Sequence, residues 1–573
     1  MTKFYLYGNT SVRTPMRFQK GLTVIQKEGF NGNLSTREME IKFKKALDQE
    51  GVIREQKDVR DTSSVARKWR SALSKTGFLT PIGKSGETLV NSVAAKYPAL
   101  GLQHTAQITP QGYRLINAET TADIQDAILR ALLAIQIKLD GDSDRYFKPF
   151  PFAMRVMNDL KKKGVDEAIN RMELVYIGSV MNNAESDKVA ERIIRYREER
   201  QQKQGKKEKN RFDSDFFKPI AKEYGVQYET LKTYGDPNFK YMLATGLFSR
   251  KGRRIGFNEN KLVTINKILE NEPKIYKNQE DYYYNLWNGY PLPDDDKDVI
   301  IEEIKVLSQK LGESIPKNMN KDSVPDLKQR MHSLQDKDNR NHEKEFAADQ
   351  VNQVNDIICY LRVLDGEKKG SDDNFKNALE NATDDLPTYF EWTTWRAFLA
   401  IDGLENAPGN ARGFRVDQDL YPSGTAPGGR PDNMFEFKDY ILVVEVTLTT
   451  SSRQEAAEAE PVRRHVAQIQ EEHPDKPVYG LFIAKDIDNN TAEMFRLGMW
   501  YSKDDPFFIN IVPITIKQFI TIMEKFEKYK FTNEQIERLI EKCLIPRNAT
   551  VTLWKNEIDR IIDNYQFAYM YRD

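Results

Sequence analysis

The spacing of apolar residues predicts a chain that is helical over most of its length and contains buried strands near its end. In residues 35–50 the apolar side chains recur every four positions, as on one face of a helix. By contrast, residues 433–437 and 440–446 are short runs rich in Phe, Ile, Val and Tyr, and these residue types favour strands. Two further buried strands are expected at residues 478–487 and 507–516.

The two strand-like runs flank the dipeptide Lys438-Asp439. If this dipeptide is a two-residue hairpin turn, counting outward places Asp432 opposite Glu445. Directly opposed residues in an antiparallel pair hold their Cβ atoms about 4.5–5.5 Å apart. Two carboxylates that close repel each other unless a cation lies between them, and Mg²⁺ often binds through only one or two carboxylates. The hairpin is therefore a candidate site for a divalent metal ion such as Mg²⁺, although acidic residues at strand ends are also common without a metal, and spacing alone does not decide between the two.

Composition limits the class of protein. A chain of 573 residues is long enough for three or four domains, and 39% hydrophobic with 30% charged residues is typical of a rather polar globular protein. No run approaches the roughly 18–20 apolar residues of a membrane span, and the N-terminus lacks the apolar region of a signal peptide. Cys359 and Cys543, both in apolar helical contexts, indicate reduced thiols in a cytoplasm.

The charge is balanced, with 86 Lys and Arg against 86 Asp and Glu. The whole chain therefore exerts no general attraction on nucleic acid, and any DNA-binding surface must be a local basic patch. No Cys/His cluster has the spacing of a zinc site.

Residues 1–120 are predicted to form a winged-helix-like recognition subdomain. A helix near residues 63–75 precedes residues 106–119, which are expected to form a short hairpin. A helix followed by a hairpin is the pattern of a winged helix, whose second helix can enter the major groove. The candidate DNA-contacting residues of this subdomain are Arg13, Arg17, Arg67, Lys68 and Arg70.

Residues 121–280 are predicted to form a second such subdomain. The tetrapeptide at 245–248 resembles that at 76–79, again after a helix and before a turn-rich hairpin. The turn is expected to carry four cations that touch nothing acidic, which favours DNA contact over a solvated turn. These cations are Arg250, Lys251, Arg253 and Arg254.

The predicted fold class is multidomain α+β. A helical linker is expected at 281–385 and an α/β domain at 386–573. In that domain a helix carrying Glu391 precedes a three-strand meander, formed by a strand at 414–420 and the hairpin. The order Pro-Asp…Glu-x-Thr resembles the core of PD-(D/E)xK restriction-endonuclease-like domains, with Thr447 where that family usually has Lys.

The segments FEWTTW, GGRPD…VVEVT, EAEPVRRH and LFIAKDIDNNTAEMF together resemble the type IIS restriction endonucleases related to AlwI, MlyI, PleI and the nicking enzyme BstNBI. The match is close across about 380–500 and looser before it. The resemblance implies acidic active-site residues at Glu391, Asp432, Glu445 and Glu458, a histidine at His465 and a metal-binding carbonyl at Val446. Metal ligands would be Asp432, Glu445, Val446, Glu391 and Glu458.

The resemblance implies a bacterial Mg²⁺-dependent enzyme that binds a short asymmetric DNA sequence and hydrolyses phosphodiester bonds at a fixed distance outside it. It would cut both strands by transient homodimerisation of nuclease domains or nick one strand, and a DNA methyltransferase would be its counterpart. Either Glu458 or His465 could orient the attacking water. Two alternatives remain: a winged-helix DNA-binding regulator with an inactive nuclease-like domain, and a nuclease of DNA repair or transposition.

Overall fold

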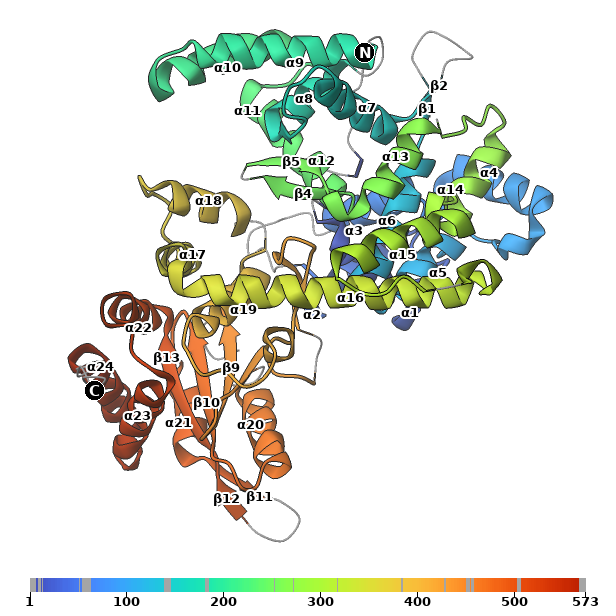
Figure 1. Ribbon diagram of the computed structural model, residues 1–573. Helices are drawn as coiled ribbons and strands as arrows, with labels where there is room; N and C mark the ends of the chain where they lie inside the picture. The colour runs from blue at the N-terminus through green and yellow to red at the C-terminus, as the bar shows by residue number, and fades with distance from the viewer. Residues whose placement is uncertain are drawn as a thin grey trace. The chain divides into compact units, whose positions relative to one another are not determined.

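The computed structural model divides the chain into two compact units, Met1–Gln335 and Asp336–Asp573, which we call unit 1 and unit 2. Each has its own buried core, and Figure 1 labels helices and strands of both units. The structure describes residues 7–8, 12, 14–50, 52–53, 63–138, 146–180, 185–251, 253–271, 273–316, 318–382, 385–426, 429–449, 454, 458–501 and 506–565.

Unit 1 is mainly helical. Its helices are α1 (Phe18–Lys27), α2 (Arg37–Gln49), α3 (Ser63–Lys75), α4 (Gly83–Lys96), α5 (Pro110–Ile116), α6 (Thr121–Ala134), α7 (Pro149–Lys162), α8 (Arg171–Val180), α9 (Ser186–Gln201), α10 (Gly205–Glu223), α11 (Tyr228–Thr233), α12 (Gly235–Leu243), α13 (Leu262–Glu270), α14 (Gln279–Asn288) and α15 (Lys297–Lys310). Its strands are β1 (Ile137–Lys138), β2 (Tyr146–Phe147), β3 (Ile169–Asn170), β4 (Phe248–Lys251) and β5 (Arg254–Phe257).

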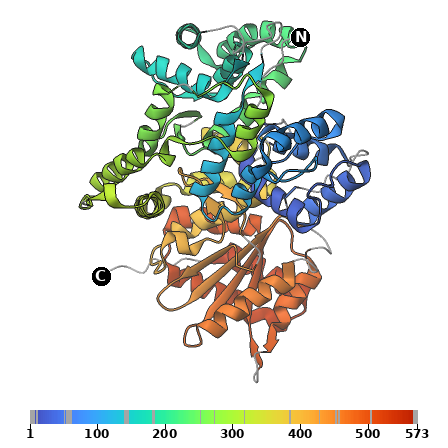
Figure 2. The ribbon, with the colours of Figure 1, turned by 90° about the vertical axis from the view of Figure 1, so that its right-hand side faces the viewer.

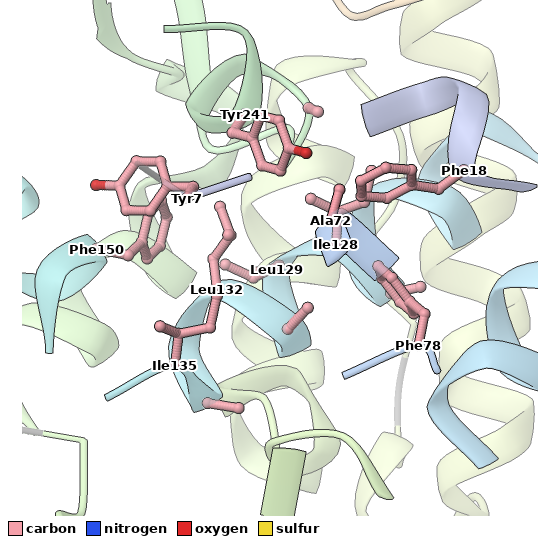
Figure 3. Close-up of a cluster of buried hydrophobic side chains, with 14 of the residues drawn as sticks. Tyr7, Phe18, Ala72, Phe78, Ile128, Leu129, Leu132, Ile135, Phe150 and Tyr241 are labelled. Carbon is pink, nitrogen blue, oxygen red and sulfur yellow. The ribbon is translucent and has the colours of Figure 1, made fainter. Parts of the chain in front are cut away.

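The core of unit 1 joins segments that lie far apart in the sequence. The ring of Phe18 packs edge-on against Phe78 at 5.8 Å and against Tyr241 at 5.9 Å (Figure 3). Tyr7 packs edge-on against Phe150 at 6.1 Å. One buried cluster runs from Tyr7 to Leu292, so the two predicted recognition subdomains share a core. The division of the chain into four domains stays a prediction.

A three-stranded sheet in unit 1 has the order β3-β5-β4, with both pairs antiparallel. The hairpin expected after the tetrapeptide at 245–248 is confirmed, since Lys251 pairs with Arg254 across the turn. Along the chain, α7 precedes β3, helices α8 to α12 lie between β3 and β4, and the hairpin β4–β5 completes the sheet.

The predicted hairpin at 106–119 is wrong. Helix α5 occupies this stretch, because Thr109 caps it by accepting a hydrogen bond from the Gly112 amide at 3.0 Å. Pro110 takes the first helical position, where its missing N–H costs nothing. Among the described residues of 1–120, therefore, no hairpin follows α3.

Helix α16 (Val324–Asp349) crosses the boundary between the units. The remaining elements belong to unit 2: α17 (Val354–Asp365), α18 (Asp373–Ala382), α19 (Leu386–Leu399), β6 (Arg415–Val416), β7 (Pro422–Gly424), β8 (Asn433–Glu436), β9 (Ile441–Thr447), α20 (Glu460–Glu472), β10 (Val478–Ala484), α21 (Asn489–Leu497), β11 (Met499–Tyr501), β12 (Pro506–Phe508), β13 (Asn510–Thr515), α22 (Ile516–Tyr529), α23 (Asn533–Leu544) and α24 (Val551–Asn564). The helical character predicted for 281–385 is confirmed by α15 to α18.

The central sheet of unit 2 has the order β13-β10-β9-β8, and its strands lie side by side in both views (Figures 1 and 2). Strands β13, β10 and β9 are parallel, whereas β8 joins β9 antiparallel. The predicted register is confirmed: Phe435 pairs with Leu442, and the Phe437 amide donates to the Tyr440 carbonyl at 2.9 Å across the two-residue turn.

Helices cover both faces of this sheet (Figure 1). A Cβ on Gly480 of β10 would lie 2.8 Å from Val466 of α20, so this face carries α20. The next residue, Leu481, lines an apolar cavity with Phe398 of α19 and Phe519 of α22 on the other face. Side chains alternate between faces along a strand, so Glu445, which pairs with Phe482, lies on the α20 face.

The predicted three-strand meander is wrong. Strand β6 pairs with β7 in a separate two-stranded sheet, outside the central four strands. An isolated antiparallel bridge between Arg412 and Asn433 connects the segment before β6 to β8. Among the described residues, no helix is both long and apolar enough to cross a membrane. Cys359 and Cys543 are buried free thiols.

Candidate active site

The two carboxylates singled out by the hairpin register lie together beside the end of β9. The β8–β9 register, continued one residue past Asn433, places Asp432 opposite Glu445. Asp432 Oδ2 accepts a hydrogen bond from the Val446 amide at 2.9 Å. The parallel strands β9 and β10 end here, and ligands of α/β sheets bind beyond the carboxyl ends of the strands.

His465 contacts this pair from α20. Its Nδ1 lies 2.6 Å from Glu445 Oε1, and its side chain is 8% exposed. Its Nε2 is buried and has no hydrogen-bond partner among the described residues. Pro461 stands in the first turn of α20, which lets the helix begin at Glu460 and place His465 in its second turn.

Glu458 reaches the same edge from the residues just before α20. Its Oε1 accepts hydrogen bonds from the hydroxyls of Thr447 at 3.1 Å and Thr449 at 3.4 Å. Thr447, which the sequence resemblance compares with a Lys position, thus orients a carboxylate and supplies no cation.

Glu391 lies in α19, and its hydrogen bonds connect it to the first residue of β8 and to a residue shortly before that strand. Its Oε2 accepts from the Ala426 amide at 2.8 Å, and its backbone carbonyl accepts from Asn433 Nδ2 at 3.3 Å. Both the side chain of Glu391 and that of Asn433 are buried. Glu391 is thus attached to the residue that follows Asp432.

The carboxylates share an environment that opposes their ionisation. Burial, with the charge of Glu458, raises the pKa of Glu445 to about 8 although hydrogen bonds oppose the shift. Burial and then the charge of Glu445 raise the pKa of Asp432 well above its usual range. Burial raises the pKa of Glu458 despite the two threonine hydroxyls, and burial with the charge of Arg464 lowers the pKa of His465. The site therefore favours neutral carboxyls, because burial and neighbouring carboxylates disfavour their ionisation.

This arrangement fits a divalent cation. Among the described residues, no three or more His, Cys, Asp or Glu side chains form a group placed to hold a metal ion. Mg²⁺ requires fewer, since it commonly takes one or two carboxylates and completes its shell with water and phosphate oxygens. Asp432 and Glu445 would provide these two, and a bound cation would offset the burial that raises the pKa values of both carboxyls.

The family model for AlwI restriction endonuclease matches residues 95–522, which is most of the chain. The chain belongs to this family. The predicted resemblance is confirmed, and the AlwI-family protein is accordingly a site-specific restriction nuclease, a hydrolase that binds DNA.

A solved structure also resembles the AlwI-family chain, namely the small subunit (R.BspD6I2) of the heterodimeric restriction endonuclease R.BspD6I. It shares 21% sequence identity, covers 37% of this chain and all of its own, and has a TM-score of 0.29. No curated protein matches.

The cations predicted for the hairpin turn of unit 1 do have acidic neighbours, so that part of the prediction is wrong. Lys251 pairs with Glu167 at 2.8 Å, and Arg254 pairs with Asp166 at 2.8 Å. These acids precede β3, which pairs with β5 and thereby brings them to the turn. Arg253 is exposed at the turn, and Arg250 is half-buried.

The other predicted DNA contacts differ in exposure. Arg67 and Lys68 are exposed on α3, and Arg17 is half-buried. Arg70 is buried: it pairs with Glu40 at 2.6 Å and donates to the Leu34 carbonyl at 2.7 Å, which gives it a structural role. Arg13 lies outside the described residues.

Sequence reasoning missed two buried amides at the site, Asn433 and Gln454. Asn433 directly follows Asp432 and points to the opposite face, toward Glu391. Gln454 lies in the connection between β9 and α20, where the sequence shows no periodic pattern. Its burial depends on a turn of the chain more than thirty residues later, so no local signal could have revealed it.

Proposed function

We propose that this AlwI-family protein is a type IIS endonuclease. It binds a short asymmetric sequence in double-stranded DNA and, with Mg²⁺, hydrolyses phosphodiester bonds at a fixed distance outside that sequence. The observation that carries the proposal is the meeting of Asp432, Glu445, Glu458 and His465 at one edge of the unit 2 sheet.

Asp432 and Glu445 would hold the divalent ion, with the Val446 carbonyl as a further ligand and Glu391 supporting the site from α19. When bound, the ion supplies positive charge to the scissile phosphate and lowers the pKa of a water molecule. Glu458, oriented by Thr447 and Thr449, lies where it can hold a second ion or orient the water.

His465 is suited to accept a proton. Burial lowers its pKa, so the imidazole is neutral at neutral pH. With Nδ1 donating to Glu445 Oε1, the lone pair is on Nε2, which has no partner among the described residues. Nε2 can then take a proton from the attacking water, while Glu445 fixes the tautomer and the ring orientation.

For DNA recognition we propose the winged-helix-like part of unit 1. In the order α7, β3, α8, α12 and β4–β5, the strand β3 pairs with the second hairpin strand, as expected for a wing. Helix α12 is buried along most of its length, so DNA contact is assigned to the hairpin turn around Arg253. Arg250, Lys251, Arg254, Arg17, Arg67 and Lys68 are further candidates.

We propose that residues 1–280 recognise DNA and that residues 386–573 cut it. Residues 281–385 would connect these two parts. The described residues form one such carboxylate cluster per chain, whereas a duplex has two strands. Cleavage of both strands therefore needs transient pairing of two nuclease units, and without it the enzyme nicks. A methyltransferase that protects the host's copies of the site would be the functional counterpart.

The test compares wild type with Asp432→Asn and Glu445→Gln on supercoiled plasmid, with Mg²⁺ or EDTA, followed by run-off sequencing of both strands. Wild type should make metal-dependent breaks at one offset from one short sequence. Both variants should lose at least about 100-fold in rate while binding the duplex as wild type does. Glu471→Gln, an exposed substitution on α20, is the control. A variant that cuts within a few-fold of wild type would refute the assignment, and scattered breaks would indicate a nuclease without a recognition sequence.

A further inference from the structure

Gln454 is completely buried and makes three hydrogen bonds to backbone groups. Its Nε2 donates to the Thr449 carbonyl at 3.0 Å and to the Asp486 carbonyl at 2.8 Å. Its Oε1 accepts from the Asp488 amide at 2.9 Å. Both N–H donors of this amide are thus used to hold backbone carbonyls in place.

The groups that Gln454 joins belong to two connections at the carboxyl edge of the sheet. Thr449 follows β9, on the way to α20, and Asp486 and Asp488 follow β10, on the way to α21. Asp488 is also the N-cap of α21, since its side chain accepts from the amides of Asn490 and Thr491. Gln454 therefore fixes the β9–α20 connection to a rigid helix start.

The fixed connection is the one that carries Glu458. Gln454 holds the Thr449 carbonyl, while the Thr449 hydroxyl donates to Glu458 Oε1 at 3.4 Å. The Thr449 amide also donates to Thr447 Oγ1 at 3.0 Å, and that hydroxyl in turn donates to Glu458 at 3.1 Å. Thr449 thus links Gln454 to both hydroxyls that orient the Glu458 carboxylate.

We infer that Gln454 is a positioning residue for the nuclease reaction, acting through Thr449 and Thr447 to hold Glu458 beside Asp432 and Glu445. This rests on the proposed function, because it assigns Glu458 a part in binding the ion or the water. Groups that orient metal-binding carboxylates commonly affect metal affinity or activity by about 10–100-fold.

The chain offers a matched control in Gln470. Its Nε2 donates to the carbonyls of His473 and Lys476, both at 3.1 Å, and its Oε1 accepts from the Val478 amide at 3.0 Å. Gln470 therefore joins two carbonyls and one amide just as Gln454 does, but at the amino end of β10. Loss of either side-chain amide removes the same set of three hydrogen bonds, two donated to carbonyls and one accepted from a backbone amide.

The experiment compares full-length wild type, Gln454→Met and Gln470→Met. Three quantities are measured: the thermal midpoint in EDTA, the Mg²⁺ concentration that gives half of the thermal stabilisation by Mg²⁺, and the single-turnover rate of plasmid cleavage. Binding of the duplex in EDTA is measured alongside. Gln454→Glu serves as a second variant, because it keeps the acceptor for the Asp488 amide and loses both donors.

Both methionine variants should lower the thermal midpoint to a similar extent and leave duplex binding unchanged. Only the Gln454 variants should raise the half-saturating Mg²⁺ concentration and slow cleavage, each by about tenfold or more. Equal behaviour of Gln454→Met and Gln470→Met in these two measurements would overturn the inference and leave Gln454 a structural residue. If wild type binds Mg²⁺ but cuts no DNA, the proposed function fails, while the Mg²⁺ titration still decides the role of Gln454.

Discussion

Glu445 brings a negative charge into a buried place beside two other carboxylates. Its pKa is raised to about 8 by burial and by Glu458, while His465, the basic side chain in contact with it, has a lowered pKa. Without a cation, ionising this group costs folding free energy. The arrangement that would bind a metal therefore destabilises the metal-free fold.

Stability in EDTA should consequently fall as pH rises from about 4.3, the usual pKa of an unfolded Glu, to about 8, the folded value. In this window the folded state binds more protons than the unfolded state, so the free energy of unfolding decreases with pH. The limiting slope from one such group is about 1.4 kcal/mol per pH unit. Thermal melts of wild type and Glu445→Gln from pH 5 to 9 in EDTA measure it.

Glu445→Gln should flatten this decline, and its thermal midpoint at pH 8 should exceed that of wild type in EDTA but not in Mg²⁺. The substitution retains a partner for His465 Nδ1. Glu471→Gln, which changes an exposed carboxylate, should follow the wild-type curve. Parallel curves for wild type and Glu445→Gln would show that Glu445 is not held in this environment.

The role of His465 can be separated from its contact with Glu445. In His465→Asn the side-chain amide can still donate toward Glu445, but no atom replaces Nε2. If Nε2 accepts the proton of the water, His465→Asn and His465→Ala should both lose about 100-fold in single-turnover rate, within the usual range for a general base. Wild-type rate should also fall as pH drops through the lowered pKa of His465. A substantial rescue by Asn would instead assign His465 to orienting Glu445.

At the scale of elements, the sequence predicts what local rules control. The β8–β9 hairpin was predictable in register, because alternation along two strands and a two-residue turn leave one pairing, and that pairing brings Asp432 to Glu445. The hairpin prediction for residues 106–119 failed because the N-cap at Thr109 and the proline after it specify a helix, in a stretch whose sequence resembles a turn. Only the three-dimensional structure shows Gln454 and the acids beside the β4–β5 turn, since partners distant in sequence create both.

The β4–β5 hairpin carries a prediction of its own. Arg253 is exposed at the turn, whereas Arg254 is half-buried and pairs with Asp166 at 2.8 Å. Arg253→Ala should weaken duplex binding by about tenfold, as expected for losing one close phosphate or base contact. Arg254→Ala should have a smaller effect. Fluorescence anisotropy with the recognition duplex and a scrambled duplex measures both.

The pattern of loss also identifies the contact. An equal loss on both duplexes would assign Arg253 to phosphate, and relaxed discrimination at one base pair would assign it to base recognition. No change on either duplex would remove the hairpin from the DNA-binding surface and leave α3, with Arg67 and Lys68, as the next candidate.

At the scale of the whole molecule, the residues proposed for recognition and those proposed for cleavage lie in two units with separate cores. Helix α16 is the covalent connection: Leu327 and Met331 pack in a small cluster of unit 1, while Phe346 stacks on Trp395 at 5.6 Å in unit 2. Units with separate cores can unfold separately, and each ligand stabilises only the unit that binds it.

Calorimetry of the full chain should therefore show two transitions. Mg²⁺ should raise only the temperature of the transition that belongs to unit 2. The recognition duplex in EDTA should raise only the temperature of the transition that belongs to unit 1. A ligand at 100 times its dissociation constant adds about 2.7 kcal/mol to the unit that binds it, enough to separate the transitions. Asp432→Asn should abolish the Mg²⁺ shift and keep the DNA shift, and Arg253→Ala should do the reverse. A single transition raised by both ligands would instead mean that α16 couples the two cores into one cooperative unit, so that binding at the recognition sequence stabilises the nuclease site directly.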